Sequence, residues 1–217
     1  MTDFATARRM MVDNQIRPAD VTDLRLLAAL ETVPREEFLP PALRALAYLD
    51  FDLAPLPGCD RRMLKPMLLA RLVQAVELGP QDRVLDLGCL TGYSAAVLAR
   101  LAGQVTALDE DHAMTAEATR RLAGLSHVTV VTGPLPAGWP PQAPYDVIVI
   151  NGACEAEPDN LLGQLADGGR LVCILREGPV ARAVLYLRSG GTVGRRILFD
   201  AAAATLPGFA RETGFVF

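Results

Sequence analysis

The sequence predicts an α/β fold built on a Rossmann-like, doubly wound and mostly parallel sheet. From residue 83 to 175, short β-branched runs alternate with amphipathic stretches, which is the pattern of strands and helices in such sheets. A glycine-containing turn follows the first run, where these folds pass from strand to helix. The chain has 217 residues, of which 51% are hydrophobic, and this suits one buried core with a short appendage.

Residues 1–80 are expected to form an N-terminal helical extension that includes a substrate-side segment, and residues 81–217 to form the Rossmann-like domain. The composition shifts near Gly79-Pro80, and the first part reads as helical with interruptions. The expected helices are one that Asp20 caps, with Val21, Leu24, Leu27 and Ala28 on one face, a short one within Arg35 to Tyr48, and one that Pro66 opens, with Leu68, Leu69, Leu72, Val73 and Val76 on one side.

Five strands are expected in the second part, at residues 84–87, 105–108, 128–131, 147–150 and 170–175. Asp111 is expected to cap a helix that Gly124 ends. A second helix starts at Pro158, carries Leu161, Leu162 and Leu165 on one face, and ends at Gly168-Gly169. Residues 183–187 and 193–199 then flank Ser189-Gly190-Gly191, which predicts an antiparallel C-terminal hairpin.

Charge and composition argue against several classes of function. The chain has 21 basic and 25 acidic residues, so it lacks the positive charge that drives binding to nucleic acid. Its four cysteines are scattered and it has two histidines, so neither a metal site nor a disulfide framework is expected. No window holds eighteen uninterrupted apolar residues, and we expect a cytoplasmic protein that does not bind membranes. Nothing in the sequence indicates the oligomeric state.

The glycine turn after the first strand is the most informative segment. Gly88 and Gly92 permit close approach of a ligand to the backbone, although they could serve the turn alone. Leu90 stands where the dinucleotide pattern G-x-G-x-x-G has its middle glycine, which weakens a diphosphate site. Asp109 follows the second strand, where a carboxylate can accept hydrogen bonds from a ribose. The alternative is that Asp109, Glu110 and Asp111 are helix-capping or solvated acidic residues, and we prefer that interpretation for Asp111. A ligand that has a nucleoside but no diphosphate fits both the glycine turn and Asp109, and S-adenosylmethionine is the commonest such cofactor.

Four segments resemble the protein-L-isoaspartate O-methyltransferase family, and they are Val33 to Phe38, Val84 to Leu98, Ala143 to Val149 and Leu165 to Val172. The resemblance implies a Rossmann-like methyltransferase domain and S-adenosylmethionine as methyl donor. It also implies methyl esterification of a carboxylate of damaged aspartyl residues, with a protein or peptide as partner. The alternative is a catalytically silent or acceptor-switched homologue that binds the cofactor without isoaspartyl methylation.

The resemblance places the cofactor at the ends of the first three strands. Gly88 and Gly92 match its cofactor loop, and Asp109 matches its acidic ribose ligand. Leu90 replaces the central loop glycine, and Pro134 replaces an aspartate expected near the adenine amino group. The predicted cofactor-binding residues are Asp86, Gly88, Cys89, Leu90, Gly92, Tyr93, Asp109, Glu110, Pro134 and Leu135.

The substrate side departs furthest from the family. Its Thr-Ile-Ser-Gln-Pro segment appears as Arg62 to Pro66, with Leu64 where the active-site serine belongs, and leucine cannot form the hydrogen bonds of a hydroxyl. The substrate-side candidates are Arg62, Leu64 and Asn151. Arg61, Arg62 and Lys65 could pair with an anionic acceptor or form a solvated loop, and Asn151 could face the methyl group or cap its loop. No catalytic group is assigned, because an ionised carboxylate needs no general base.

Overall fold

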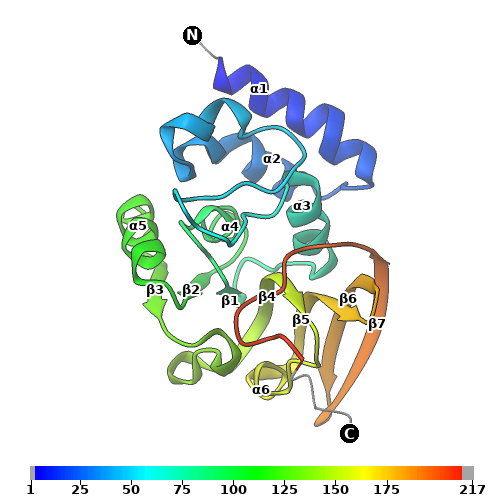
Figure 1. Ribbon diagram of the computed structural model, residues 1–217. Helices are drawn as coiled ribbons and strands as arrows, with labels where there is room; N and C mark the ends of the chain where they lie inside the picture. Colours follow the sequence, from blue (N-terminus) through cyan, green and yellow to red (C-terminus); the bar gives the residue numbers. More distant parts are fainter. Residues whose placement is uncertain (1–2, 212–217) are drawn as a thin grey trace, which may run out of the picture.

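The computed structural model describes residues 3–211, and a seven-stranded sheet in the order β3-β2-β1-β4-β5-β6-β7 lies at its centre (Figure 1). The strands from β3 to β5 are parallel, and β6 and β7 add to β5 in antiparallel fashion. The predicted fold class and C-terminal hairpin are confirmed. The strands are β1 (Arg83–Leu87), β2 (Gln104–Asp109), β3 (Val128–Thr132), β4 (Tyr145–Cys154), β5 (Leu165–Glu177), β6 (Val180–Ser189) and β7 (Thr192–Asp200).

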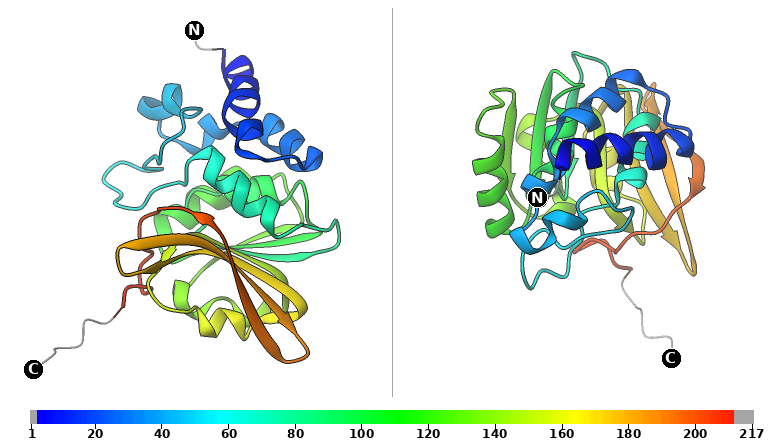
Figure 2. Two further views of the ribbon diagram at one scale, coloured as in Figure 1. Left: turned by 90° about the vertical axis from the view of Figure 1, so that its right-hand side faces the viewer. Right: turned by 90° about the horizontal axis from the view of Figure 1, so that it is seen from above.

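Two hydrophobic cores cover the two faces of the sheet. Successive strand residues point to opposite faces, so Val84 joins one core and Leu85 the other. The first core contains the N-terminal helices together with α3, α4 and α5, and α6 packs in the second (Figure 2). The helices are α1 (Phe4–Met11), α2 (Leu24–Thr32), α3 (Pro66–Ala75), α4 (Tyr93–Leu98), α5 (His112–Leu122) and α6 (Asp159–Leu162).

Helix α2 begins later than the sequence predicts. Asp23 is its N-cap, since the Asp23 carboxylate accepts hydrogen bonds from the amides of Arg25 and Leu26. The prediction that Asp20 caps this helix is wrong, because Asp20 has a left-handed backbone (φ 63°) that ends the preceding turn. Of the four residues on the predicted face, Val21 and Leu27 are buried as expected and the other two are not. Leu24 is 73% exposed and Ala28 is also exposed, and the buried residues are Leu26, Leu27, Ala29 and Leu30.

Two other predicted helices differ in the structure. Arg35 to Tyr48 forms two 3-10 helices, Arg35–Phe38 and Pro41–Leu46, because the prolines between them cannot donate the amide bonds of a continuous α-helix. Helix α6 ends at Leu162, and Leu165 instead starts β5, where it pairs with Tyr145. Gly168-Gly169 therefore lies inside β5, at a register shift, rather than at the end of a helix.

The N-terminal segment packs directly on the sheet. Residues of α1, α2 and α3 share the first core with β1 and β4. Arg35 is fully buried there, and its guanidinium donates to the carbonyls of Ala47 (2.9 Å) and Leu64 (2.8 Å). Residue 80 lies in the turn between α3 and β1, and the division into 1–80 and 81–217 stays a prediction. Among the described helices, none combines the length and apolar character that crossing a membrane requires.

Candidate active site

The turn after β1 has three residues with positive φ. Gly88 and Gly92 have φ of 76° and 96°, and Leu90 has φ of 53°. The left-handed conformation of Leu90 costs about 1–2 kcal/mol. Its amide donates to Asp109 Oδ2 (2.8 Å), and its side chain is buried in the first core. A Cβ on Gly92 would lie 2.8 Å from the Leu122 side chain, so this glycine is also needed for helix packing.

Asp109 ends β2 and is fully buried beside the turn. Its Oδ2 accepts the amide of Leu90, and its Oδ1 accepts the amide of Asp111 (3.1 Å). Arg61 Nη1 also donates to Oδ1 and forms an ion pair with this carboxylate. Asp111 caps α5 through the amides of Ala113 and Met114, as predicted. The structure therefore brings Asp109 to the glycine turn, with an arginine from the substrate-side segment on its carboxylate.

Asp86, near the end of β1, is hydrogen-bonded to Asn151, which lies within β4 at a register shift. Asn151 Nδ2 donates to Asp86 Oδ1 (2.7 Å) and to the Leu87 carbonyl (3.1 Å), and Ser94 Oγ donates to Asp86 Oδ2 (2.7 Å). Burial raises the pKa of the Asp86 carboxyl to about 7, although the bonds from Ser94 and Asn151 lower that pKa. With both Nδ2 hydrogens engaged, the Asn151 oxygen is the group left to accept a bond from a ligand.

Cys89 and Tyr93 lie on the buried side of the same turn. Burial raises the pKa of the Cys89 thiol well above its usual value, so the thiol stays protonated. The Arg35 guanidinium lies 4.7 Å from the centre of the Tyr93 ring. Burial also raises the pKa of the Tyr93 hydroxyl. Both residues therefore shape the base of the turn as neutral groups.

Three further predicted cofactor-binding residues, Glu110, Pro134 and Leu135, follow β2 and β3 in the chain. Glu110 is exposed, directly after Asp109. The Gly133 amide donates to the Asp109 carbonyl (3.0 Å), which places Pro134 close to Asp109. Leu135 is fully buried in the second core at the start of a 3-10 helix, Leu135–Ala137. Its side chain therefore supports this edge of the sheet.

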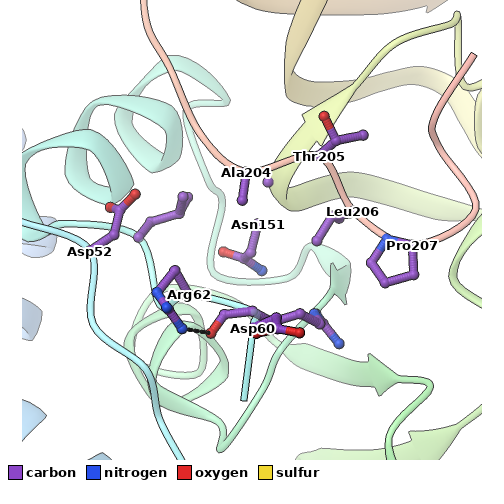
Figure 3. Close-up of a pocket in the computed structure, with 11 residues that line it drawn as sticks. Asp52, Asp60, Arg62, Asn151, Ala204, Thr205, Leu206 and Pro207 are labelled. Carbon is purple, nitrogen blue, oxygen red and sulfur yellow. Dashed lines mark hydrogen bonds between the residues drawn. The ribbon is translucent and has the colours of Figure 1, made fainter. Parts of the chain in front are cut away.

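Two cavities meet at Leu64 and Asn151. One, at the glycine turn, has a volume of about 10 Å³ and is bounded by Gly88, Leu90 and Tyr93 among others. The other has about 170 Å³ and is shown in Figure 3. Its lining residues are Asp52, Asp60, Arg61, Arg62, Leu64, Asn151, Gly152, Ala204, Thr205, Leu206 and Pro207.

The predicted basic cluster is divided among different partners. Arg61 pairs with Asp109, and Lys65 Nζ lies 3.4 Å from Asp50. Arg62 lies at the wall of the larger cavity (Figure 3). Its Nη1 donates to the carbonyls of Cys59 (2.5 Å) and Arg61 (3.3 Å). Arg62 therefore has no acidic side chain among its hydrogen-bond partners in the described part of the chain, and it is the arginine most available to an acceptor.

The C-terminal segment contributes to the site, which sequence reasoning missed. Thr205 bridges to Ala153 in β4, and the Leu206 amide donates to the Ala153 carbonyl (2.9 Å). A Cβ on Gly152 would lie 2.5 Å from the Leu206 side chain, so only glycine allows this contact. No periodic pattern marks the segment. Of the C-terminal phenylalanines, Phe209 packs in the second core, and Phe215 and Phe217 lie outside the described residues.

The residues at the turn have the chemistry that S-adenosylmethionine requires. Asp109 offers carboxylate oxygens at the strand end, where a ribose can donate to them. The atoms nearest to a Cβ on Gly88 would belong to the side chains of Arg61 (3.0 Å) and Leu206 (3.5 Å), so movable side chains lie directly above this glycine. Within residues 3–211, no group of three or more His, Cys, Asp and Glu side chains could hold a metal ion.

Comparisons with known proteins agree with this geometry. A family model described as protein-L-isoaspartate(D-aspartate) O-methyltransferase matches residues 6–193. The chain is 44% identical to protein-L-isoaspartate O-methyltransferase 1 of Rhodopseudomonas palustris (strain HaA2) over 174 residues, covering 79% of this chain and 70% of that protein. It is 35% identical to the protein-L-isoaspartate O-methyltransferase of Koribacter versatilis (strain Ellin345), covering 96% and 94%.

A solved protein-L-isoaspartate O-methyltransferase has the same fold. It superposes with a TM-score of 0.81 at 25% identity, over 93% of this chain and 66% of that protein. Both the sequence and the fold comparisons thus extend over most of this chain. The chain therefore belongs to the protein-L-isoaspartate(D-aspartate) O-methyltransferase family of S-adenosylmethionine-dependent enzymes.

Proposed function

We propose that the chain transfers a methyl group from S-adenosylmethionine to the free carboxylate of a damaged aspartyl residue in a protein or peptide. The observation that carries this proposal is the meeting of the two cavities at Leu64 and Asn151. One cavity lies at the glycine turn, where the Leu90 amide donates to the buried Asp109, and the other is lined by Arg61 and Arg62. A methyl donor and a carboxylate can therefore be held next to each other where the two cavities meet.

The chain's contribution to the reaction is to bind and to orient. S-adenosylmethionine supplies a methyl group on a positively charged sulfur, and a carboxylate oxygen can attack it in line. Asp109 would hold the ribose, and Gly88 lets the donor approach the backbone closely. Leu64 and Leu90 line the smaller cavity with apolar surface, which excludes water from the attacking oxygen. No residue needs to remove a proton, because the acceptor is ionised at neutral pH.

Arg62 and Asn151 are the proposed acceptor-binding residues. The Arg62 guanidinium can bind a carboxylate by charge-assisted hydrogen bonds, and it lines the larger cavity. The Asn151 oxygen can accept an N–H bond from the backbone of the same peptide. Leu64 offers no hydroxyl, so recognition of the carboxylate depends on the arginine more than it would with serine at this position.

Methyl transfer to a peptide with one isoaspartyl residue tests the proposal. With labelled S-adenosylmethionine, we expect a base-labile methyl ester on this peptide and none on the same peptide with a normal aspartyl residue. Arg62→Ala should raise KM for the peptide about tenfold or more, since a hydrogen bond to a charged group contributes about 1.5–3 kcal/mol.

Arg17→Ala is the matched control, because Arg17 is an exposed arginine that pairs with Asp13 on an N-terminal turn outside both cavities. Its KM should equal that of the unchanged protein. An Arg62→Ala variant with unaltered KM would remove Arg62 from the site. S-adenosylmethionine binding without any transfer to the isoaspartyl peptide would replace this proposal with the silent or acceptor-switched homologue, which Leu64 favours.

A further inference from the structure

Arg61 lies between the cofactor turn and the acceptor cavity. Its Nη1 donates to Asp109 Oδ1, and its side chain is 15% exposed. Its Nη2 lies 3.0 Å from the position of a Cβ on Gly88, so the guanidinium covers this glycine. Neither Nε nor Nη2 has a hydrogen-bond partner within residues 3–211, although both are buried. Most of the hydrogen-bonding capacity of this arginine is thus unused where it now lies.

The Asp109 carboxylate cannot serve Arg61 and a ribose at the same time. A carboxylate has about four acceptor positions. The amides of Leu90 and Asp111 use two of them and Arg61 uses a third, whereas the two hydroxyls of a ribose need two. The cavity at the turn has only about 10 Å³, about enough for a single water molecule. Arg61 must therefore leave Asp109 before a nucleoside can bind.

The larger cavity can receive the Arg61 side chain once it leaves Asp109. Arg61 already lines the 170 Å³ cavity together with Arg62 and Asn151. It belongs to a segment that contains no helix, in which Leu53 and Met63 form an isolated bridge. Rotating the Arg61 side chain away from Asp109 breaks no helix or sheet hydrogen bond. In the larger cavity its guanidinium would stand beside Arg62, where two cations can bind one carboxylate.

We propose that Arg61 couples cofactor binding to acceptor binding. In the ligand-free protein it closes the cofactor site by pairing with Asp109. The ribose hydroxyls displace it into the acceptor cavity, where it binds the carboxylate of the peptide. The cofactor then binds first and strengthens peptide binding, and by linkage the peptide strengthens cofactor binding by the same factor. This inference rests on the proposed function for the identity of the acceptor.

Calorimetry with S-adenosylhomocysteine and an isoaspartyl peptide tests the coupling without turnover. Arg61→Ala should bind S-adenosylhomocysteine about tenfold more tightly than the unchanged protein, because the ribose no longer has to displace an arginine from Asp109. Arg61→Gln, which keeps a polar but shorter and uncharged side chain, should behave in the same way. Arg62→Ala removes the neighbouring charge but not the contact with Asp109, and its affinity should change by no more than about twofold.

The second arm measures peptide binding with and without saturating S-adenosylhomocysteine. The unchanged protein should bind the isoaspartyl peptide about tenfold more tightly when S-adenosylhomocysteine is present, and both Arg61 variants should lose this difference. Thermal unfolding of each variant identifies loss of fold, and Arg61→Gln then decides the result if Arg61→Ala is unfolded.

Several results would overturn the coupling. They are equal or weaker S-adenosylhomocysteine affinity in a folded Arg61 variant, absence of binding to every protein tested, and an undiminished peptide difference in the variants. If S-adenosylhomocysteine binds to the Arg61 variants and not to the unchanged protein, the result would support the proposal that Arg61 closes the cofactor site. Coupled peptide binding without methyl transfer would contradict the proposed function and leave the role of Arg61 standing, whereas methyl transfer without coupling would do the reverse.

Discussion

At the residue scale, Asp86 shows how burial sets the chemistry of a single side chain. It is fully buried and accepts hydrogen bonds from Ser94 and Asn151. Burial disfavours the charged form more than these two bonds favour it, so its pKa rises to about 7. The carboxyl therefore changes charge near neutral pH at the centre of the proposed site. Its ionisation must weaken the fold, since the charged form loses solvation there.

Asp86→Asn should make the stability less dependent on pH. The folded-state pKa of Asp86 lies above its ordinary value of 3.8, so the folded protein binds more protons and becomes less stable as pH rises from about 4 to 7. The amide has no such titration, and it can still bond to Asn151 and Ser94 if the Ser94 hydroxyl reverses. Urea unfolding at several pH values should show the variant gaining up to about 4 kcal/mol relative to the unchanged protein across this window. Parallel curves would contradict this account.

At the element scale, the ends of α2 are fixed by one side chain and one backbone conformation. The Asp23 carboxylate caps the helix, and Asp20 holds the left-handed position three residues earlier. Gln74 of α3 supports the same corner, since its Oε1 accepts the amides of Thr22 (2.6 Å) and Asp23 (3.1 Å). The start of α2 is thus determined jointly by its own cap and by a neighbouring helix.

Substitutions at the two aspartates should have opposite effects on stability. Asp23→Ala removes the cap and should lower the free energy of unfolding by about 1 kcal/mol. Asp20→Gly relieves the positive φ of 63° and should leave the free energy unchanged or raise it by up to about 1 kcal/mol. Urea denaturation measures both. A larger loss at Asp20 than at Asp23 would show that the cap is at the position predicted from the sequence.

At the scale of the whole molecule, the N-terminal helices and the sheet share one core. Leu30 of α2 is fully buried in the same cluster as Val84 and Val149 of the sheet. The Arg35 guanidinium also connects a 3-10 helix to Ala47 and Leu64. The substrate-side segment is therefore held by the N-terminal helices and by the sheet together, which positions it across the ends of the strands.

Leu30→Ala should destabilise the whole molecule and not the N-terminal helices alone. Removing this buried side chain should cost about 2–5 kcal/mol. Trp139, the single tryptophan, packs against the second core on the other face of the sheet. Its fluorescence and far-UV circular dichroism should shift to the same lower urea midpoint. Leu24→Ala, on the same helix but 73% exposed, is the control and should change little. An unshifted fluorescence transition would show two independently unfolding units.

The sequence by itself determined the strands, the glycine turn, the position of Asp109 and the family. These features are local, because each is recognised from residues that are adjacent in the sequence: a β-branched run, a glycine in a turn, or the residue that follows a strand. The structure differs from the predicted elements at the start of α2, in the proline-broken stretch after it, and at the boundary between α6 and β5. Contacts with other elements act at the first and third of these, through Gln74 and through the pairing of Leu165 with Tyr145.

Only the tertiary structure decided how the site is completed. Arg61 pairs with Asp109 across 48 residues, and Asn151 bonds to Asp86 across 65. The C-terminal segment contacts β4 through Thr205 and Leu206, and no periodic pattern in the sequence predicts this contact. Contacts of this kind depend on which chain segments the folded core brings together, and no spacing within a single segment records them. For this reason the sequence indicated a basic cluster, and the structure showed that Arg61 is the member of this cluster that pairs with Asp109.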